Sequence, residues 1–161
     1  SIKVYRNANG FLVLNEVPIV ENIWMLATGT GIGPYLSILK TQNSWERFDR
    51  VVLVHAVRYE KELTYQDTIK ELKKKYGERF IYITFVSREE SENSLSGRIP
   101  ESIKNGKLED KAKIKMLPEN THIMLCGNPD MLRDTTITLK EIGLKKHRRS
   151  SPGHITTENY W

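Results

Sequence analysis

Short apolar runs alternate along most of the chain with segments whose apolar residues recur every three or four positions. The runs predict buried strands, because continuous apolar sequence suits a strand covered on both faces, as in a parallel sheet. Four strands are predicted, over residues 23–27, 51–56, 80–86 and 122–125. Helices are predicted over 33–40 and 65–76, from Pro100 onward, and from Pro129 to Gly143. In the second helix the apolar spacing of four, three and four residues produces one buried face.

The first 18 residues follow a different pattern. Residues 2–5 alternate like a strand, Asn9-Gly10 is a turn signal, and residues 11–14 form a short apolar run that no helix follows. This pattern is typical of the tail of a β structure, and Pro18 marks the predicted boundary. We therefore expect a β remnant over residues 1–18 and a separate α/β domain over residues 19–161.

Strands that alternate with helices form parallel βαβ units, which together build a doubly wound sheet. In such sheets ligands bind beyond the carboxyl ends of the strands. Small, polar or cationic residues follow all four predicted strands, at Thr28–Thr30, Arg58, Ser87-Arg88 and Gly127-Asn128. The topology places these residues along one edge, so the sequence predicts a binding site there.

The first strand leads into a glycine-rich turn, Thr28-Gly29-Thr30-Gly31-Ile32-Gly33, followed by Pro34. Glycine allows a close approach of the backbone to a ligand, and the free N–H groups at a helix start favour an anion. The turn therefore resembles a phosphate cradle, although its spacing is G-x-G-x-G rather than the dinucleotide G-x-G-x-x-G. The alternative is a turn that only connects strand to helix.

Arginine and serine follow the second and third strands, where nucleotide sites discriminate between ribose substituents. An NAD site usually has a carboxylate after the second strand, whereas arginine there favours the 2′-phosphate of NADP. Arg58, Ser87, Arg88 and Arg98 are the candidates, because a guanidinium matches the oxygens of a phosphate. Taken singly, each arginine is also compatible with an ordinary solvated surface charge.

Composition narrows the remaining choices. The chain of 161 residues carries a formal charge of +5 and a single cysteine, Cys126, which excludes an internal disulfide. No apolar run approaches the roughly 20 residues of a membrane helix, and the first residues lack the apolar segment of a signal peptide. A cytoplasmic protein with no membrane partner is expected. Cys126 itself suits a small buried hydrophobe better than a reactive thiol.

The segment 145–149, Lys-Lys-His-Arg-Arg, is the densest run of positive charge. It is compatible with a solvated surface, an acidic protein or nucleic acid. Proteins that bind single-stranded nucleic acid interleave aromatic residues with their charges, and this run has none, so no nucleic-acid partner is predicted. The histidines and the single cysteine show no metal-ligand spacing, so no metal is predicted either.

Five ordered motifs together resemble the nucleotide domain of the ferredoxin (flavodoxin)–NADP reductases, and most of all their bacterial single-chain branch. The motifs are Leu-Ala-Thr-Gly-Thr-Gly-Ile-Gly-Pro from residue 26, His-Ala-Val-Arg-Tyr from residue 55, Val-Ser-Arg-Glu from residue 86, Ser-Gly-Arg-Ile-Pro from residue 96, and Met-Leu-Cys-Gly-Asn-Pro from residue 124. The terminal Glu-Asn-Tyr-Trp carries the resemblance to the bacterial branch. The resemblance implies a doubly wound five-stranded parallel sheet.

The resemblance also implies a mechanism, in which NADPH gives a hydride to FAD and the flavin passes single electrons to ferredoxin or flavodoxin. It implies that Cys126 and Glu158 lie at the reacting end of the nicotinamide and are the catalytic residues. It implies a cofactor-binding set in which Thr30 lies near the flavin and the nicotinamide, and in which Tyr160 and Trp161 pack on the flavin or its adenine. The implied set is Thr28, Gly29, Thr30, Gly31, Arg58, Ser87, Arg88, Arg98, Gly127, Asn128, Tyr160 and Trp161.

The sequence departs from this family at its front. The flavin motif Arg-x-Tyr-Ser of the FAD-binding barrel is absent, and residues 1–18 resemble only the last strand of that barrel and the connection after it. We therefore expect a fragment that binds NADP(H) but has little or no reductase activity alone. The alternative is a stand-alone NADP or nucleotide-binding module without redox activity.

Overall fold

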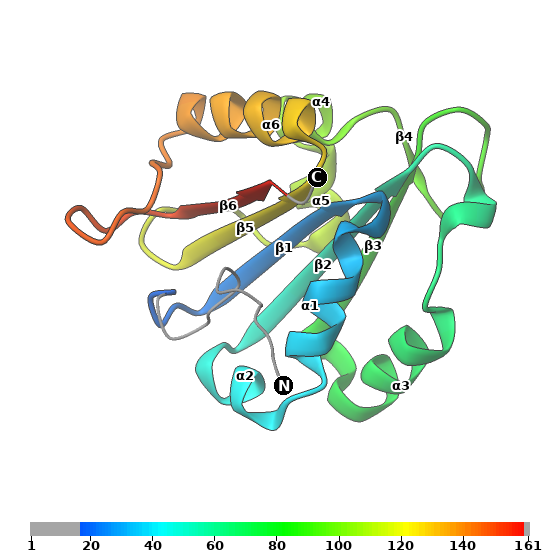
Figure 1. Cartoon of the computed structure of the whole chain (residues 1–161), viewed down its shortest axis with the longest axis horizontal. Coiled ribbons are helices and arrows are strands. Elements are labelled where there is room, and N and C mark those ends of the chain that lie inside the picture. The colour runs from blue at the N-terminus through cyan, green and yellow to red at the C-terminus, as the bar shows by residue number, and fades with distance from the viewer. Residues whose placement is uncertain (1–16, 160–161) are drawn as a thin grey trace.

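The computed structural model describes residues 17–159, and its centre is a parallel sheet of six strands in the order β4-β3-β2-β1-β5-β6 (Figure 1). The strands are β1 Asn22–Thr28, β2 Arg50–Val57, β3 Phe80–Val86, β4 Leu95–Ser96, β5 Thr121–Gly127 and β6 Ile155–Asn159. Strand β1 lies between β2 and β5 and is in register with both, with Met25 opposite Leu53 and Met124.

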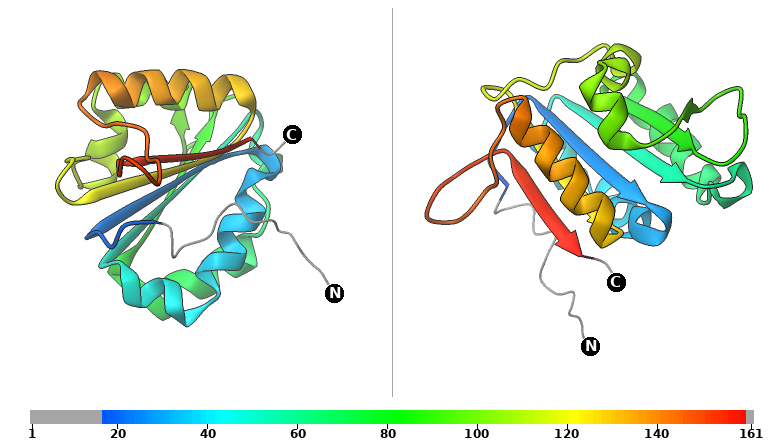
Figure 2. Two further views of the ribbon diagram at one scale, coloured as in Figure 1. Left: turned by 60° about the vertical axis from the view of Figure 1, so that its left-hand side comes forward. Right: turned by 90° about the horizontal axis from the view of Figure 1, so that it is seen from above.

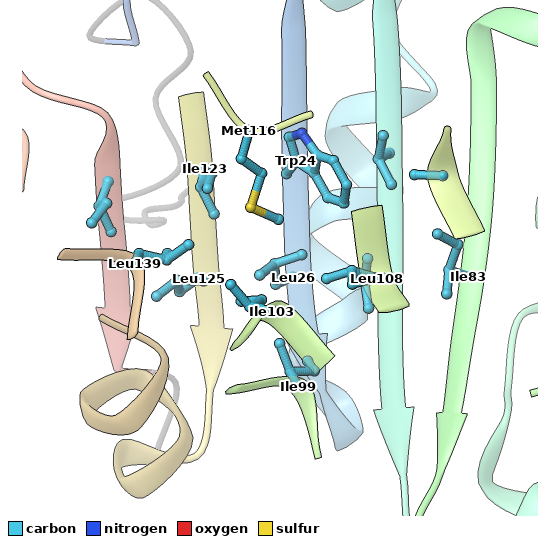
Figure 3. Packing of buried hydrophobic residues seen from close by; sticks show 14 of the residues in the cluster. Trp24, Leu26, Ile83, Ile99, Ile103, Leu108, Met116, Ile123, Leu125 and Leu139 are labelled. Atoms are coloured by element: carbon cyan, nitrogen blue, oxygen red, sulfur yellow. The ribbon is translucent and has the colours of Figure 1, made fainter. Parts of the chain in front are cut away.

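Helices cover both faces of the sheet, as the continuous apolar strands predict (Figure 2). One face carries α1 Ile32–Leu39, α2 Gln42–Arg47 and α3 Gln66–Tyr76, and the other carries α4 Ile99–Lys104, α5 Lys107–Ala112 and α6 Pro129–Glu141. Successive residues of β1 point to opposite faces, so that Trp24 and Leu26 pack in one core while Ile23 and Met25 pack in the other. Figure 3 shows the first of these cores, where Ile103 and Leu108 from α4 and α5 meet the sheet.

The four strands predicted from the apolar pattern are all present, and each helix predicted between them is present. The sheet holds two further strands, β4 and β6, which makes six where the resemblance implies five. The pattern missed both because they are polar edge strands. Strand β4 has only two residues, and in β6 the side chain of Ile155 is buried while those of Thr156, Thr157 and Glu158 are half-buried.

Two short helices were also missed, α2 and α5, each of six residues. Most of the predicted β remnant over residues 1–18 lies outside the described residues, as do Tyr160 and Trp161. The described part of the chain contains no helix that is long and apolar enough to cross a membrane.

Candidate functional site

A cleft of about 820 Å³ opens at the carboxyl edge of the sheet, where the sequence predicts a site. It lies beyond the ends of β1, β2 and β3 and beside the starts of α4 and α6. Eight of the predicted site residues line this cleft, namely Thr28, Gly29, Thr30, Arg58, Ser87, Arg88, Arg98 and Asn128. The structure thus brings together residues that are 100 positions apart in the chain.

The glycine-rich turn forms a short 3-10 helix, Gly29–Gly31, that leads directly into α1. It packs closely against the turn after β5. A Cβ atom on Gly31 would lie 2.7 Å from the carbonyl oxygen of Cys126, and a Cβ on Gly127 would collide with the Thr28 hydroxyl. That hydroxyl accepts a hydrogen bond of 3.0 Å from the N–H of Asn128. Glycine is therefore required at Gly31 and Gly127 by the close approach of two turns, which leaves Thr28 and Asn128 facing the cleft.

A histidine that the sequence analysis did not select supports the same turn. His55, in β2, is fully buried, and its Nε2 lies 2.8 Å from the carbonyl oxygen of Gly29. Burial lowers the pKa of this imidazole, so it is neutral near pH 7. A histidine inside an apolar strand resembles a core residue, and only the register of β1 against β2 reveals its partner.

Arg58 and Arg88 are held side by side by backbone hydrogen bonds between the ends of β2 and β3. The N–H of Arg88 donates to the carbonyl oxygen of Arg58 over 2.9 Å, and the N–H of Ser87 donates to that of Val57 over 3.1 Å. Among residues 17–159, no group pairs with the guanidinium of Arg88. This cation is therefore available to an anionic ligand.

Arg58 is paired with a carboxylate that the sequence analysis also missed, Glu62. The ion pair measures 3.3 Å, and Glu62 also accepts hydrogen bonds from the N–H groups of Tyr59 and Arg58. These bonds, that from Tyr59 above all, lower the pKa of the Glu62 carboxyl. The side chain of Arg58 remains 61% exposed, so a stronger anion can compete for its guanidinium.

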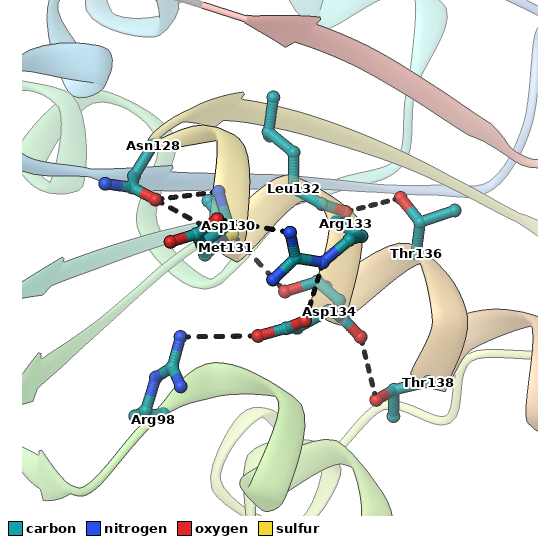
Figure 4. Close-up of polar contacts among 10 residues, drawn as sticks. Arg98, Asn128, Asp130, Met131, Leu132, Arg133, Asp134, Thr136 and Thr138 are labelled. Atoms are coloured by element: carbon teal, nitrogen blue, oxygen red, sulfur yellow. Dashed lines mark hydrogen bonds and ion pairs between the residues drawn. The ribbon is translucent and has the colours of Figure 1, made fainter.

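Arg98 also lines the cleft and contacts helix α6 (Figure 4). Its guanidinium is 3.6 Å from the carboxylate of Asp134, which also pairs with Arg133. Asn128 caps this helix, because its side-chain oxygen accepts hydrogen bonds from the N–H groups of Asp130 and Met131. The helix predicted from Pro129 therefore begins there, and Asn128 also lies in the wall of the cleft.

Cys126, Glu158, Gly31 and Gly127 do not line the cleft. Cys126 is fully buried and free, as expected for a small hydrophobe, and stands opposite Glu158 in the register of β5 and β6. Burial raises the pKa of its thiol to about 11, with a smaller contribution from the negative charge of Glu158. Burial also raises the pKa of the Glu158 carboxyl. Cys126 is therefore a protonated thiol at neutral pH.

A family model described as an oxidoreductase NAD-binding domain matches residues 25–136. The chain belongs to this family. The matched segment of this NAD-binding domain runs from β1 into α6, and it contains every residue that lines the cleft.

Relatives of this NAD-binding domain extend the likeness. Over 161 residues, 99% of the chain, it is 50% identical to the flavodoxin/ferredoxin--NADP reductase of Escherichia coli and 45% identical to that of Buchnera aphidicola subsp. Baizongia pistaciae. The chain spans about 65% of the length of these curated relatives. A crystal structure of a ferredoxin NADP+ reductase from Neisseria gonorrhoeae, with bound FAD and NADP, superposes with a TM-score of 0.88 at 38% identity, covering 95% of this chain and 61% of that one.

Tyr65 is a further cleft residue of the NAD-binding domain that sequence reasoning placed only on the buried face of a helix. It precedes α3 with a φ of 62°, a left-handed conformation that a non-glycine residue adopts only at a cost in energy, and its side chain is 53% exposed. Strained residues of this kind cluster at functional sites. No pattern along the chain indicates this role, since a tyrosine at helical spacing is usually part of a core.

Proposed function

We propose that this chain is the NADP(H)-binding part of a flavodoxin/ferredoxin–NADP reductase. The observation that carries the proposal is the arrangement of Arg58, Arg88 and Arg98 around one cleft, with the hydroxyl of Ser87 beside them. A 2′-phosphate is the group that distinguishes NADP from NAD, and clustered guanidinium groups are its preferred partners. The names of the relatives and the NADP in the related crystal structure support the same choice.

The residues present fit a dinucleotide. The glycine turn brings bare backbone to the wall of the cleft at the start of α1, where N–H groups favour an anion. We assign the arginines and Ser87 to the 2′-phosphate of the nucleotide. The residues assigned to its 5′-diphosphate region are those of the two turns, Thr28, Gly29, Thr30, Gly31, Gly127 and Asn128. Cys126 and Glu158 are proposed to lie at the nicotinamide end, next to the same turn. In this role a bound NADPH supplies a hydride to FAD.

The rest of the reaction is proposed from the relatives alone. FAD, and ferredoxin or flavodoxin as the electron acceptor, are taken from their printed names and from the FAD in the related structure. The chain's charge of +5 suits an acidic electron-transfer partner. The residue ranges also remain proposals, with 1–18 as the end of an FAD-binding domain and 19–161 as the nucleotide domain. A cytoplasmic location is retained because Cys126 is free and buried.

Calorimetric titration with 2′-phospho-AMP and with AMP tests the proposal. The protein should bind the doubly phosphorylated ligand more tightly, and Arg88→Ala should weaken that binding by roughly tenfold or more, because a charged hydrogen bond is worth about 1.5–3 kcal/mol. Arg50→Ala is the matched control, since Arg50 is an exposed arginine that begins the neighbouring strand β2, at the end opposite the cleft. Equal binding of the two ligands, or an equal loss in both variants, would refute an NADP site.

A stand-alone nucleotide-binding module is the second candidate, favoured by one observation. Residues between Thr28 and Met131 are sufficient to bring Arg58, Arg88 and Arg98 together around one cleft. Flavin absorbance of the purified protein, and electron transfer after addition of an isolated FAD domain, separate the two candidates. Restored electron transfer supports the reductase, and nucleotide binding that never supports electron transfer favours the module.

A further inference from the structure

Within residues 17–159 the side chain of His55 makes one hydrogen bond, and that bond is to the glycine turn. Its Nε2 lies 2.8 Å from the carbonyl oxygen of Gly29, and a carbonyl oxygen can only accept. The proton must therefore be on Nε2, which leaves Nδ1 as an acceptor. Nδ1 is buried and has no hydrogen-bond partner within residues 17–159.

An imidazole is an unfavourable choice for this position if packing alone decides. His55 is fully buried in β2, opposite Ala27 and Thr84 on the neighbouring strands. A buried acceptor without a partner destabilises the folded state, whereas an apolar side chain of similar size carries no such cost. The bond to Gly29 is thus the one contact of His55 that an apolar residue could not replace.

That bond fixes the direction of a whole peptide unit. Because the peptide group is planar and trans, the carbonyl of Gly29 and the N–H of Thr30 point in opposite directions. Gly29 has a φ of 52°, and a glycine can adopt several backbone conformations at little cost. Holding the carbonyl toward His55 therefore selects one orientation of the N–H of Thr30, a residue that lines the cleft.

We propose that His55 is a positioning residue for dinucleotide binding, which holds the Gly29–Thr30 peptide in the orientation that receives the 5′-diphosphate of NADP(H). The proposal rests on the proposed function and concerns a different part of the ligand from the arginines. His55 acts through the turn and does not contact the ligand itself. The pKa of its imidazole, lowered by burial, keeps it in the neutral form that donates a single hydrogen bond.

The test compares NADP+ with adenosine 2′-monophosphate, which lacks the 5′-diphosphate, by calorimetry at pH 7.5. The variant His55→Leu removes the donor, and His55→Gln restores an N–H at a similar reach. His122→Leu is the matched control. His122 is also fully buried, with an Nδ1 that has no partner within residues 17–159, but it lies near the start of β5, at the far end of the sheet.

We expect His55→Leu to weaken the binding of NADP+ by about tenfold, the effect of one lost hydrogen bond. The affinity for adenosine 2′-monophosphate should stay within about twofold of that of the original protein. His55→Gln should recover most of the NADP+ affinity, and His122→Leu should change neither ligand. A His55→Leu protein that keeps its NADP+ affinity, or that loses both ligands equally, would overturn the positioning role. If the original protein binds neither ligand, both the proposed function and this inference are refuted.

A measurement on the unaltered protein covers the case in which His55→Leu does not fold. Nuclear magnetic resonance of the imidazole nitrogens should show the tautomer with its proton on Nε2, and NADP+ should slow the exchange of this proton with solvent. Adenosine 2′-monophosphate should leave its exchange rate unchanged. The opposite tautomer, or an exchange rate that responds equally to both ligands, contradicts the proposal.

Discussion

Gly127 is the residue at which the two turns beside the cleft come closest. Its φ is 142°, and any side chain there would collide with Thr28. The backbone conformation and the contact with Thr28 therefore both require glycine at this position. Neither constraint is relieved unless β1 moves relative to β5.

Replacing Gly127 by alanine is expected to lower the free energy of unfolding by about 2–4 kcal/mol, because strain in the backbone adds to the clash. Gly143→Ala separates the two effects, since Gly143 has a φ of 100° but no neighbour within 4 Å of an added Cβ. That variant should lose only about 1 kcal/mol. Denaturant unfolding measures both, and equal losses would show that the contact with Thr28 contributes nothing.

At the scale of secondary-structure elements, helix α6 depends on the residue before it. The side chain of Asn128 accepts two backbone N–H groups of the first turn, and the same residue lies in the wall of the cleft. Stability of the helix and charge in the cleft can therefore be changed separately at one position.

Asn128→Ala should reduce the free energy of unfolding by about 1 kcal/mol, the usual effect of a lost cap. Asn128→Asp keeps an acceptor and favours the positive end of the helix, so it should stay within about 0.5 kcal/mol of the original protein. The new carboxylate of Asn128→Asp should nevertheless weaken the binding of 2′-phospho-AMP more than Asn128→Ala does. Unfolding and calorimetry on the two variants give the comparison, and equal affinities of the two variants would mean that Asn128 is remote from the ligand.

Helices and strands were predictable from the sequence wherever a local pattern of residues determines them. Strand β3 was placed at its observed limits because seven mostly apolar residues are bounded by turns, and Asn128-Pro129 is a direct signal for the start of a helix. Strand β6 was missed because a polar edge strand shows neither an apolar run nor strict alternation. The turn residues of the site were likewise predictable, whereas His55 acts through Gly29, which only the folded chain brings within reach. Glu62 acts on the nearby Arg58, but from a short 3-10 turn that no apolar pattern marks.

The molecule as a whole has a second group of histidines, at the end of the sheet opposite the cleft. His122 is the second residue of β5; its Nε2 forms a 2.7 Å hydrogen bond with the Thr156 hydroxyl, and its ring lies 5.7 Å from that of His147. Burial above all, with smaller contributions from the nearby His147 and His154, lowers the pKa of His122 to about 4. Lys145 adds a positive charge beside His154.

As the pH falls, the unfolded chain binds a proton at His122 near pH 6.5, whereas the folded chain binds it only near pH 4. Stability should therefore be complete above pH 6.5 and decrease as the pH falls toward 4, by up to about 3 kcal/mol in total. Denaturant unfolding at pH 8 and pH 5 should show a smaller decrease for His122→Leu than for the original protein. The difference in the free energy of unfolding between the two proteins at pH 8 serves as the control. Parallel pH profiles of the two proteins would contradict the assignment of this pH dependence to His122.

The bond between Thr28 and Asn128 joins residues 100 positions apart, and β1 is flanked by β2 on one side and by the late strand β5 on the other. During synthesis the glycine turn leaves the ribosome long before its partner exists. Strands β1, β2 and β3 can associate early, but the wall formed by Asn128 and α6 closes only when most of the chain has emerged. A growing chain therefore gains its affinity for a nucleotide late, and nucleotide binding would select completed molecules over partly made ones.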